Sequence, residues 1–157
     1  GGGPFPTELH GPEGETLKRE GFEFGATTGR PRRCGWFDAV GVRHAVRTSG
    51  ISGIALTKLD VLTGFKKIPI CTAYRYDSTL VNDFPASLKV IQHAQPVYEE
   101  MEGWDKPLEG ARKFSDLPAQ AQKYVRRLEE LVQTEIILVS VGPGREQTIL
   151  LKNPFDN

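Results

Sequence analysis

The chain has 157 residues, enough for one domain with a buried core, and its 38% hydrophobic and 25% charged residues exclude a disordered tail or linker. Twenty Lys and Arg residues balance twenty Asp and Glu residues, so no net charge draws the whole chain to nucleic acid or to an anionic membrane. The longest apolar runs, such as Ile136 to Val139, are strand-sized and too short to span a bilayer.

The first 25 residues are rich in glycine and proline and lack a sustained hydrophobic period, which predicts a loop with at most a short strand or hairpin. The chain does not begin with methionine, and it has neither the basic start nor the apolar stretch of a signal peptide. We therefore expect the sequence to begin within a longer protein.

A helix and a strand are predicted next. Apolar residues recur at helical spacing from residue 36 and stop before Ser49-Gly50: Trp36, Ala39, Val40, Val42, Ala45 and Val46. Ile51 to Leu59 is an apolar run that turns polar near its end, as expected for a buried strand whose carboxyl end opens into a site. Together they predict an αβ unit.

The middle of the chain predicts a β-hairpin and a surface excursion. Lys66 to Tyr76 is rich in β-branched and aromatic residues, and Asp77-Ser78 is typical of a turn before a strand at Thr79 to Val81. Three prolines between Asn82 and Lys113 indicate irregular structure with one strand at Pro96 to Met101.

The last quarter carries the strongest helical period. Ser115 is a candidate N-cap, and the apolar positions that follow it are Ala121, Tyr124, Val125, Leu128, Leu131 and Val132. A nearly continuous apolar strand, Ile136 to Val141, comes next, and Gln147 to Leu151 returns as a final strand. Helix, strand and polar or glycine-rich loop, occurring twice, indicate an α/β sheet with ligand loops at strand ends.

Residues 25–33, Gly-Ala-Thr-Thr-Gly-Arg-Pro-Arg-Arg, are a candidate anion-binding loop. Glycines let the backbone approach a ligand, hydroxyl groups donate hydrogen bonds, and guanidinium groups present two parallel donors to carboxylate or phosphate. A solvated basic turn has the same composition. The segment is not a Walker loop, because the required spacing of Gly and Lys-Ser/Thr is absent.

Thr57-Lys58-Leu59-Asp60 ends the first predicted strand. A carboxylate there can accept hydrogen bonds from the N1–H and the exocyclic amine of guanine, whereas adenine offers neither donor in that arrangement. The alternative is an ordinary polar strand end.

Ser140-Val141-Gly142-Pro143-Gly144 ends the other buried strand, and its main-chain groups suit a base edge or a phosphate. A plain tight turn explains the same residues.

The cysteines and histidines indicate no further chemistry. Cys34 and Cys71 are expected to be structural thiols rather than a disulfide or metal site. His10, His44 and His93 lack metal-ligand spacing.

Several blocks of the sequence, taken in order, resemble the adenylosuccinate synthetase family over nearly the whole chain. Residues 77–97 have no feature that can be placed in the family's pattern. The blocks are Gly2-Gly3-Pro4-Phe5-Pro6-Thr7-Glu8-Leu9, residues 25–38, Leu56-Thr57-Lys58-Leu59-Asp60-Val61-Leu62, Gly142-Pro143 and Asn153-Pro154-Phe155-Asp156.

The resemblance implies a P-loop-NTPase-like α/β fold, with part of a mostly parallel sheet, flanking helices and a β-hairpin excursion. It also implies a cytoplasmic, homodimeric carbon–nitrogen ligase of purine biosynthesis that joins IMP and L-aspartate at the expense of GTP and requires Mg²⁺. No nucleic acid or membrane partner is expected. The chain would be the carboxyl-terminal third of a single domain, with catalytic groups and Mg²⁺ ligands upstream and none here, so it would be inactive alone.

By the same resemblance, the aspartate and IMP loop comprises Ala26, Thr27, Thr28, Gly29, Arg30, Pro31 and Arg32. The GTP-binding residues would be Arg32, Lys58, Leu59, Asp60, Ser140, Val141 and Gly142. Four regions follow: 1–35 with the aspartate/IMP loop, 36–62 with the guanine motif, 63–113 with the hairpin and excursion, and 114–157 with the second guanine-side loop and final strand. A non-catalytic guanine-nucleotide or anion-binding module is the alternative, and a purely structural domain is the third possibility.

Overall fold

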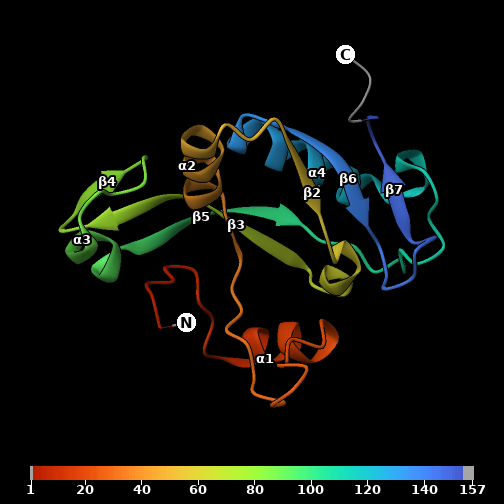
Figure 1. Ribbon diagram of the computed structural model, residues 1–157, viewed down its shortest axis with the longest axis horizontal. Coiled ribbons are helices and arrows are strands. Elements are labelled where there is room, and N and C mark those ends of the chain that lie inside the picture. Colours follow the sequence, from red (N-terminus) through yellow and green to blue (C-terminus); the bar gives the residue numbers. More distant parts are fainter. Residues whose placement is uncertain (1, 154–157) are drawn as a thin grey trace. The chain divides into compact units, whose positions relative to one another are not determined.

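The computed structural model describes residues 2–153, and its two compact units divide the chain between them. Unit 1 comprises Gly1–His44 and Pro69–Glu99, and unit 2 comprises Ala45–Ile68 and Glu100–Asn157. Figure 1 labels the helices and strands. None of the described helices has the length and apolar character needed to cross a membrane. The predicted closing block at residues 153–156 lies largely outside the described residues.

Three elements contain residues of both units, and the others belong to one. The shared elements are α2 (Ala39–Ser49), β3 (Lys67–Tyr76) and β5 (Gln95–Glu102). Unit 1 also holds α1 (Pro12–Glu20), β1 (Phe37–Asp38), β4 (Thr79–Val81) and α3 (Leu88–His93). Unit 2 also holds β2 (Gly53–Leu56), η1 (Leu59–Leu62), η2 (Phe114–Asp116), α4 (Ala119–Val132), β6 (Glu135–Ser140) and β7 (Thr148–Leu150).

The predicted β-hairpin is confirmed. Strand β3 pairs with β4 in antiparallel register, with Tyr74 opposite Val81. The turn residues Asp77 and Ser78 both have positive φ, at 46° and 63°, which matches the right-handed twist of the hairpin. Strand β1 pairs with β3 in parallel, and β5 also pairs with β3. The strand predicted at 96–101 is therefore present and slightly longer.

Helix α1 was not expected, because residues 1–25 were predicted to form a loop or hairpin. It begins with Pro12, whose fixed φ suits the first helical turn, and carries acidic residues in that turn and basic residues in the last. Leu17 is its one buried large apolar side chain. The helix therefore has no apolar stripe for a periodicity argument to find. Helix α3, in the predicted irregular excursion, was also missed, because its 6 residues are too few to show a helical period.

Helix α2 begins later than its predicted start near Trp36. Asp38 Oδ1 accepts a hydrogen bond from the main-chain N–H of Gly41 at 3.1 Å, which places Asp38 as the N-cap and Ala39 as the first helical residue. The Tyr74 hydroxyl donates to the other oxygen of Asp38. The end of the helix at Ser49 is as predicted, and Gly50 follows with φ of +62°.

In unit 2, β6 lies between β2, with which it is parallel, and β7, with which it is antiparallel (Figure 1). Helix α4 contacts β6, and five of its six predicted apolar positions are buried, Leu131 being half-buried. Strand β2 is shorter than the predicted Ile51 to Leu59. The described residues thus confirm a mixed α/β fold, and the strands form two sheets, each with parallel and antiparallel pairs.

The expected N-cap at Ser115 is wrong. Helix α4 begins at Ala119 after Pro118, and Ser115 lies in the short helix η2. Asp116 is the organising residue, because its Oδ2 accepts the main-chain N–H groups of Arg112 and Lys113 at 3.1 and 3.2 Å. A carboxylate that follows Ser115 thereby stabilises a separate turn before the long helix.

Candidate functional site

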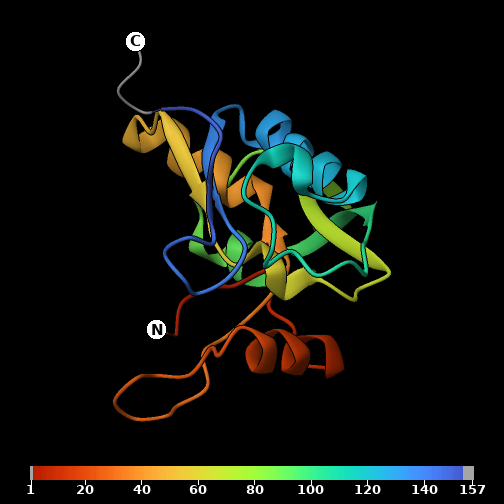
Figure 2. The same ribbon diagram turned by 90° about the vertical axis from the view of Figure 1, so that its right-hand side faces the viewer.

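The glycine- and arginine-rich segment of unit 1 folds as a narrow loop, here called the arginine loop (residues 25–33). The N–H of Gly25 donates to the carbonyl of Arg30, and the N–H of Gly29 donates to the carbonyl of Gly25, both at 2.8 Å. Gly29 has φ of +66°, a conformation that favours glycine. Figure 2 shows this loop extending from the segment that follows α1.

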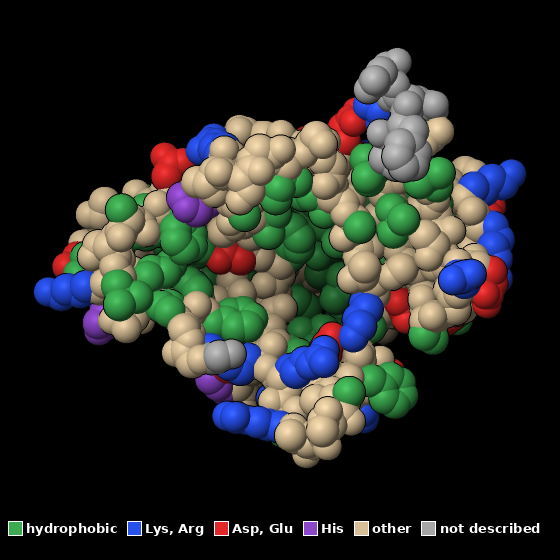
Figure 3. Space-filling model, in the orientation of Figure 1, with side chains coloured by type: hydrophobic (Ala, Val, Ile, Leu, Met, Phe, Trp, Pro, Cys, Tyr) green, Lys and Arg blue, Asp and Glu red, His purple; other side chains and the backbone are tan. Residues whose placement is uncertain are grey.

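An open cavity of about 650 Å³ adjoins the arginine loop. Its lining combines the loop with two residues of the N-terminal segment: Gly25, Thr28, Arg30, Pro31, Arg32, Arg33, Gly2 and Phe5. Ala26 and Thr27 are exposed and do not line it. Lys and Arg side chains are visible on the surface around α1 and the loop (Figure 3). The loop therefore presents positive charge and hydrogen-bond donors to a space large enough for a small anion.

The three arginines of the loop differ in their partners. The guanidinium of Arg30 has no hydrogen-bond or ion-pair partner among residues 2–153. Arg32 lies 3.2 Å from the carboxylate of Glu23 and remains largely exposed. Arg33 makes two hydrogen bonds to the carboxylate of Glu8. The donors of Arg30 are thus available to a ligand, whereas Arg32 forms one weak exposed ion pair. The donors of Arg33 are used in hydrogen bonds within the protein.

In unit 2, the parallel pairing of β2 and β6 places the loops that follow them at one edge of the sheet (Figure 1). These strand-end loops comprise residues 57–60 and 140–144. The main-chain N–H of Lys58 donates to Ser140 Oγ at 2.8 Å. Lys58 adopts the left-handed conformation with φ of 61° and immediately precedes η1. The structure therefore brings together two of the motifs that the sequence separates by 82 positions.

Asp60 has the least ordinary environment in the strand-end loops. Its Oδ1 is buried and has no hydrogen-bond partner among the described residues. Burial raises the pKa of this carboxyl and repulsion from Glu109 adds to the rise, while the main-chain N–H of Asp60 itself and the charge of Lys58 oppose it. Leu59 is 2% exposed and anchors the loop in the core. A buried carboxylate oxygen that lacks a donor is a site where a ligand N–H group would be stabilising.

The second strand-end loop is folded around Gln147. The N–H of Val141 donates to the Gln147 carbonyl, and the N–H of Gly144 donates to Gln147 Oε1, both at 2.8 Å. A side chain at Gly142 would collide with that of Gln147. Val141 is fully buried, and its main-chain N–H is already bonded within the loop.

The described residues contain no group of three or more His, Cys, Asp or Glu side chains arranged to hold a metal ion. Neither Cys34 nor Cys71 forms a disulfide within the described part of the chain. Burial, together with the nearby Asp38, raises the pKa of Cys71 to about 12, so this thiol stays protonated and packs as a small apolar side chain.

Three residues that shape these loops were not predicted from the sequence: Glu8, Glu23 and Gln147. Arg33 was predicted as part of the anion-binding loop, but its side chain binds Glu8 instead. Glu8 and Glu23 form ion pairs with Arg33 and Arg32, and Gln147 accepts hydrogen bonds from Val141 and Gly144. The motif blocks include Glu8 and Arg33, but a motif does not show that their side chains bind each other. An acidic residue close to an arginine-rich loop is the one signal that could have suggested Glu23.

Comparison with known proteins identifies the family. The family model described as adenylosuccinate synthetase matches residues 1–149. Relatives named adenylosuccinate synthetase from Moorella thermoacetica and Geotalea daltonii are 57% and 59% identical over 155 and 156 residues. Each alignment covers 99% of this chain and 36% of the relative, so the chain spans about a third of the length of these relatives.

A solved structure gives the same result. The fully ligated adenylosuccinate synthetase from Plasmodium falciparum superposes with a TM-score of 0.91 and is 36% identical in sequence. The match covers 97% of this chain and 37% of that one. Both the fold and the sequence are thus shared with the same group of enzymes, and the chain belongs to the adenylosuccinate synthetase family.

Proposed function

We propose that the complete protein containing this chain is a carbon–nitrogen ligase that joins IMP and L-aspartate to form adenylosuccinate, with conversion of GTP to GDP and phosphate, in purine nucleotide biosynthesis. The family match and the names of the relatives support this activity. In this proposal the chain is the carboxyl-terminal portion of a single domain and supplies recognition loops rather than acid–base groups.

The strand-end loops would bind the guanine base of GTP. The observation that carries this assignment is the buried, unpartnered Oδ1 of Asp60. Guanine presents N1–H and an exocyclic amine on one edge, so its binding would give the carboxylate the donors it lacks. Lys58 and Leu59 would border the base, and Ser140, Val141 and Gly142 would approach it through the second strand-end loop.

The arginine loop would bind L-aspartate, with Arg30 also contacting IMP and Arg32 reaching toward GTP. Ala26, Thr27, Thr28, Gly29 and Pro31 complete the proposed loop site. The free guanidinium of Arg30 and the adjoining cavity support this role, because a planar two-donor group matches a carboxylate. Arg32 would exchange its exposed pair with Glu23 for a ligand at little cost.

The family also implies Mg²⁺, a homodimer and a cytoplasmic location for the complete protein, which we include in the proposal. A bound Mg²⁺ would neutralise charge on the transferred phosphoryl group. We propose that its ligands lie outside these residues, so no catalytic step is assigned to a metal here. Recognition loops without those groups are expected to give no turnover from the 157-residue chain alone.

The test is Asp60→Asn in the complete protein, assayed by phosphate release that depends on GTP, IMP and aspartate together. Asn replaces an acceptor of guanine N–H groups with an amide donor. The fall in kcat/KM for GTP should therefore correspond to a loss of about 2–4 kcal/mol in transition-state stabilisation, while the KM for IMP changes little. Asp77→Asn is the matched control, because Asp77 is an exposed turn residue with positive φ, which Asn tolerates.

Equal losses for GTP and IMP would contradict the guanine assignment. GDP binding by the complete protein without any phosphate release would instead support the non-catalytic guanine-nucleotide-binding module. Absence of both binding and turnover would favour a structural domain.

A further inference from the structure

We propose that Arg33 is a positioning residue that holds the base of the arginine loop in its ligand-binding arrangement through Glu8. This inference rests on the proposed function, because it takes the arginine loop to be the aspartate site. Nothing in the motif itself separates Arg33 from the neighbouring arginines, since all three have the same side chain. Its contacts do.

Arg33 is fastened to the N-terminal segment by its whole guanidinium. Its Nε donates to Glu8 Oε1 at 2.9 Å, and its Nη2 donates to Glu8 Oε2 at 2.8 Å. Its Nη1 donates to the carbonyl of Gly3 at 2.8 Å, and the group lies 5.3 Å from the centre of the Phe5 ring. All three guanidinium nitrogens therefore have protein acceptors, in the bidentate geometry that fixes orientation best.

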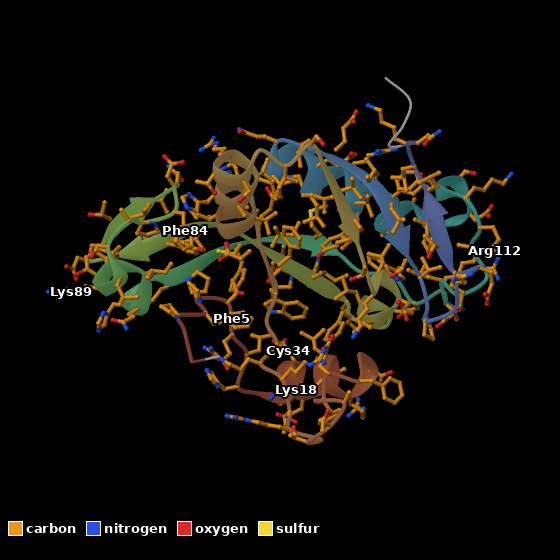
Figure 4. The ribbon with its side chains drawn as sticks, in the orientation of Figure 1. Phe5, Lys18, Cys34, Phe84, Lys89 and Arg112 are labelled. Carbon is orange, nitrogen blue, oxygen red and sulfur yellow. The ribbon has the colours of Figure 1, made fainter. Side chains whose placement is uncertain are left out.

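The main chain joins the same two segments directly beside this pair. Glu8 and Gly35 form an antiparallel bridge, and the N–H of Leu9 donates to the carbonyl of Cys34 at 2.9 Å. A Cβ at Gly35 would overlap the carbonyl of Thr7, which is 1% exposed. Figure 4 labels Phe5 and Cys34 on these two segments. These main-chain contacts therefore lie next to Arg33, at the carboxyl-terminal end of the arginine loop.

The electrostatic environment fits this role. The Glu8 side chain is 18% exposed, and its hydrogen bonds with Arg33 hold its pKa below the usual range. Arg33 is thus paired with a carboxylate that stays ionised at neutral pH. Arg30, three residues away, has no such partner in the described part of the chain. One arginine is fixed to the protein, and another is presented to the cavity.

The affinity for a ligand depends on the fraction of molecules in which the arginine loop is ordered. A ligand that binds only the ordered loop has an apparent dissociation constant equal to the intrinsic one divided by the ordered fraction. Loss of the Arg33 pair should lower that fraction, and Glu8→Gln breaks the pair without removing any residue that lines the cavity. The affinity for aspartate should then fall, while the chemistry of the bound complex is preserved.

The experiment compares Arg33→Gln, Glu8→Gln and the double variant in the complete protein, with Arg19→Gln as control. Arg19 makes an exposed pair with Glu20 on α1 and is 69% exposed. We expect the KM for aspartate to rise about tenfold in each single variant, as for a tenfold drop in the ordered fraction, with kcat and the KM for GTP within about twofold. The double variant should resemble the singles, and Arg33→Lys should restore part of the affinity.

A readout that does not need activity is the rate at which trypsin cleaves after Arg32 in the Glu8→Gln protein, measured by intact mass. Glu8→Gln keeps every tryptic site of the wild type. We expect cleavage after Arg32 to be faster in Glu8→Gln than in the wild type, and unchanged in Arg19→Gln. An unchanged KM for aspartate together with unchanged cleavage would overturn the inference. A uniform loss of kcat and of all affinities would also overturn it, in favour of general destabilisation.

Different results would contradict the proposed function and the positioning role of Arg33. A wild-type protein without aspartate-dependent phosphate release refutes the proposed function, whereas the tryptic comparison still tests the base of the loop. An active wild type whose aspartate KM responds to Arg30→Lys but not to Arg33→Gln refutes the positioning role alone. Should Arg33→Gln fail to fold, Glu8→Gln carries the test, because it keeps the arginine and alters only the charge of its partner.

Discussion

The main-chain N–H of Lys58 donates a hydrogen bond to Ser140 Oγ, joining the two strand-end loops of unit 2. The bond is 2.8 Å long and holds a lysine whose backbone is left-handed, with φ of 61°. A non-glycine residue in this conformation needs support from its surroundings. Ser140 provides that support through its side chain.

Ser140→Ala should therefore loosen the Lys58 turn. We predict a rise of about five- to tenfold in the KM for GTP, corresponding to about 1–1.4 kcal/mol for a neutral hydrogen bond, with little change in the KM for aspartate. Steady-state kinetics of the complete protein with each substrate varied in turn provide the measurement. Ser115→Ala is the control, because Ser115 is exposed and does not cap α4. A GTP KM equal to that of the control would show that the bond is dispensable.

Asp60→Asn should stabilise the ligand-free protein at neutral pH while it weakens GTP use. The pKa of Asp60 is raised by burial, so the folded protein binds this proton more tightly than the unfolded chain does. Ionisation of Asp60 therefore lowers stability above the raised pKa, and this cost disappears at low pH, where both states hold the proton. We predict that the variant unfolds at a higher temperature than the wild type at pH 8.

Thermal unfolding of the wild type and Asp60→Asn, measured without nucleotide across the pH range from 4 to 8, checks this prediction. The advantage of the variant should shrink as the pH falls toward the range in which the wild-type carboxyl is protonated. Equal midpoints at pH 8 would mean that solvent or another group already satisfies Asp60.

Arg30→Lys should raise the KM for aspartate. Lysine keeps the charge but lacks the planar fork, and among residues 2–153 the Arg30 guanidinium has no partner that could explain a structural effect. We predict a loss of about 1.5–3 kcal/mol in kcat/KM for aspartate, the range for a charged hydrogen bond. Arg19→Lys is the matched control on α1. Unchanged aspartate dependence would indicate that the arginine loop is a solvated basic turn.

Leu128→Ala should destabilise unit 2 by about 2–4 kcal/mol, because the deletion leaves a cavity under α4. Leu128 is fully buried, whereas Leu131 on the same helix is half-buried. Leu131→Ala should therefore cost less, about 1 kcal/mol. Urea-induced unfolding of the complete protein, followed by circular dichroism, compares the two. A larger loss at position 131 would reverse the assignment of the buried face.

The sequence could predict α4 and β6 because their burial follows the hydrophobic pattern of the residues themselves. It could also predict the hairpin at Asp77-Ser78, since turn residues have local causes. Helix α1 was not predicted, because only one leucine of this helix is buried. Its close contact with the preceding segment depends on Gly14 having no side chain. Periodicity detects apolar side chains and cannot detect a close approach of two backbones.

The candidate site divides in the same way. The sequence indicated which residue types suit an anion or a guanine base, and it predicted that both guanine-side loops follow buried strands. It could not indicate that Asp60 Oδ1 would be buried without a partner or that Arg33 would bind Glu8, 25 residues away. Such differences among residues of the same type arise from tertiary packing, which a local sequence pattern does not predict.

The packing of α1 has a consequence for evolution at position 14. Alanine in place of glycine inside a helix ordinarily stabilises it by roughly 0.5–1 kcal/mol. Here the added methyl carbon would lie 2.5 Å from the carbonyl oxygen of Leu9, on the segment that carries Glu8. A substitution that improves the isolated helix would therefore push α1 off the segment it covers. Selection for local helix stability and selection for docking act in opposite directions at this one residue.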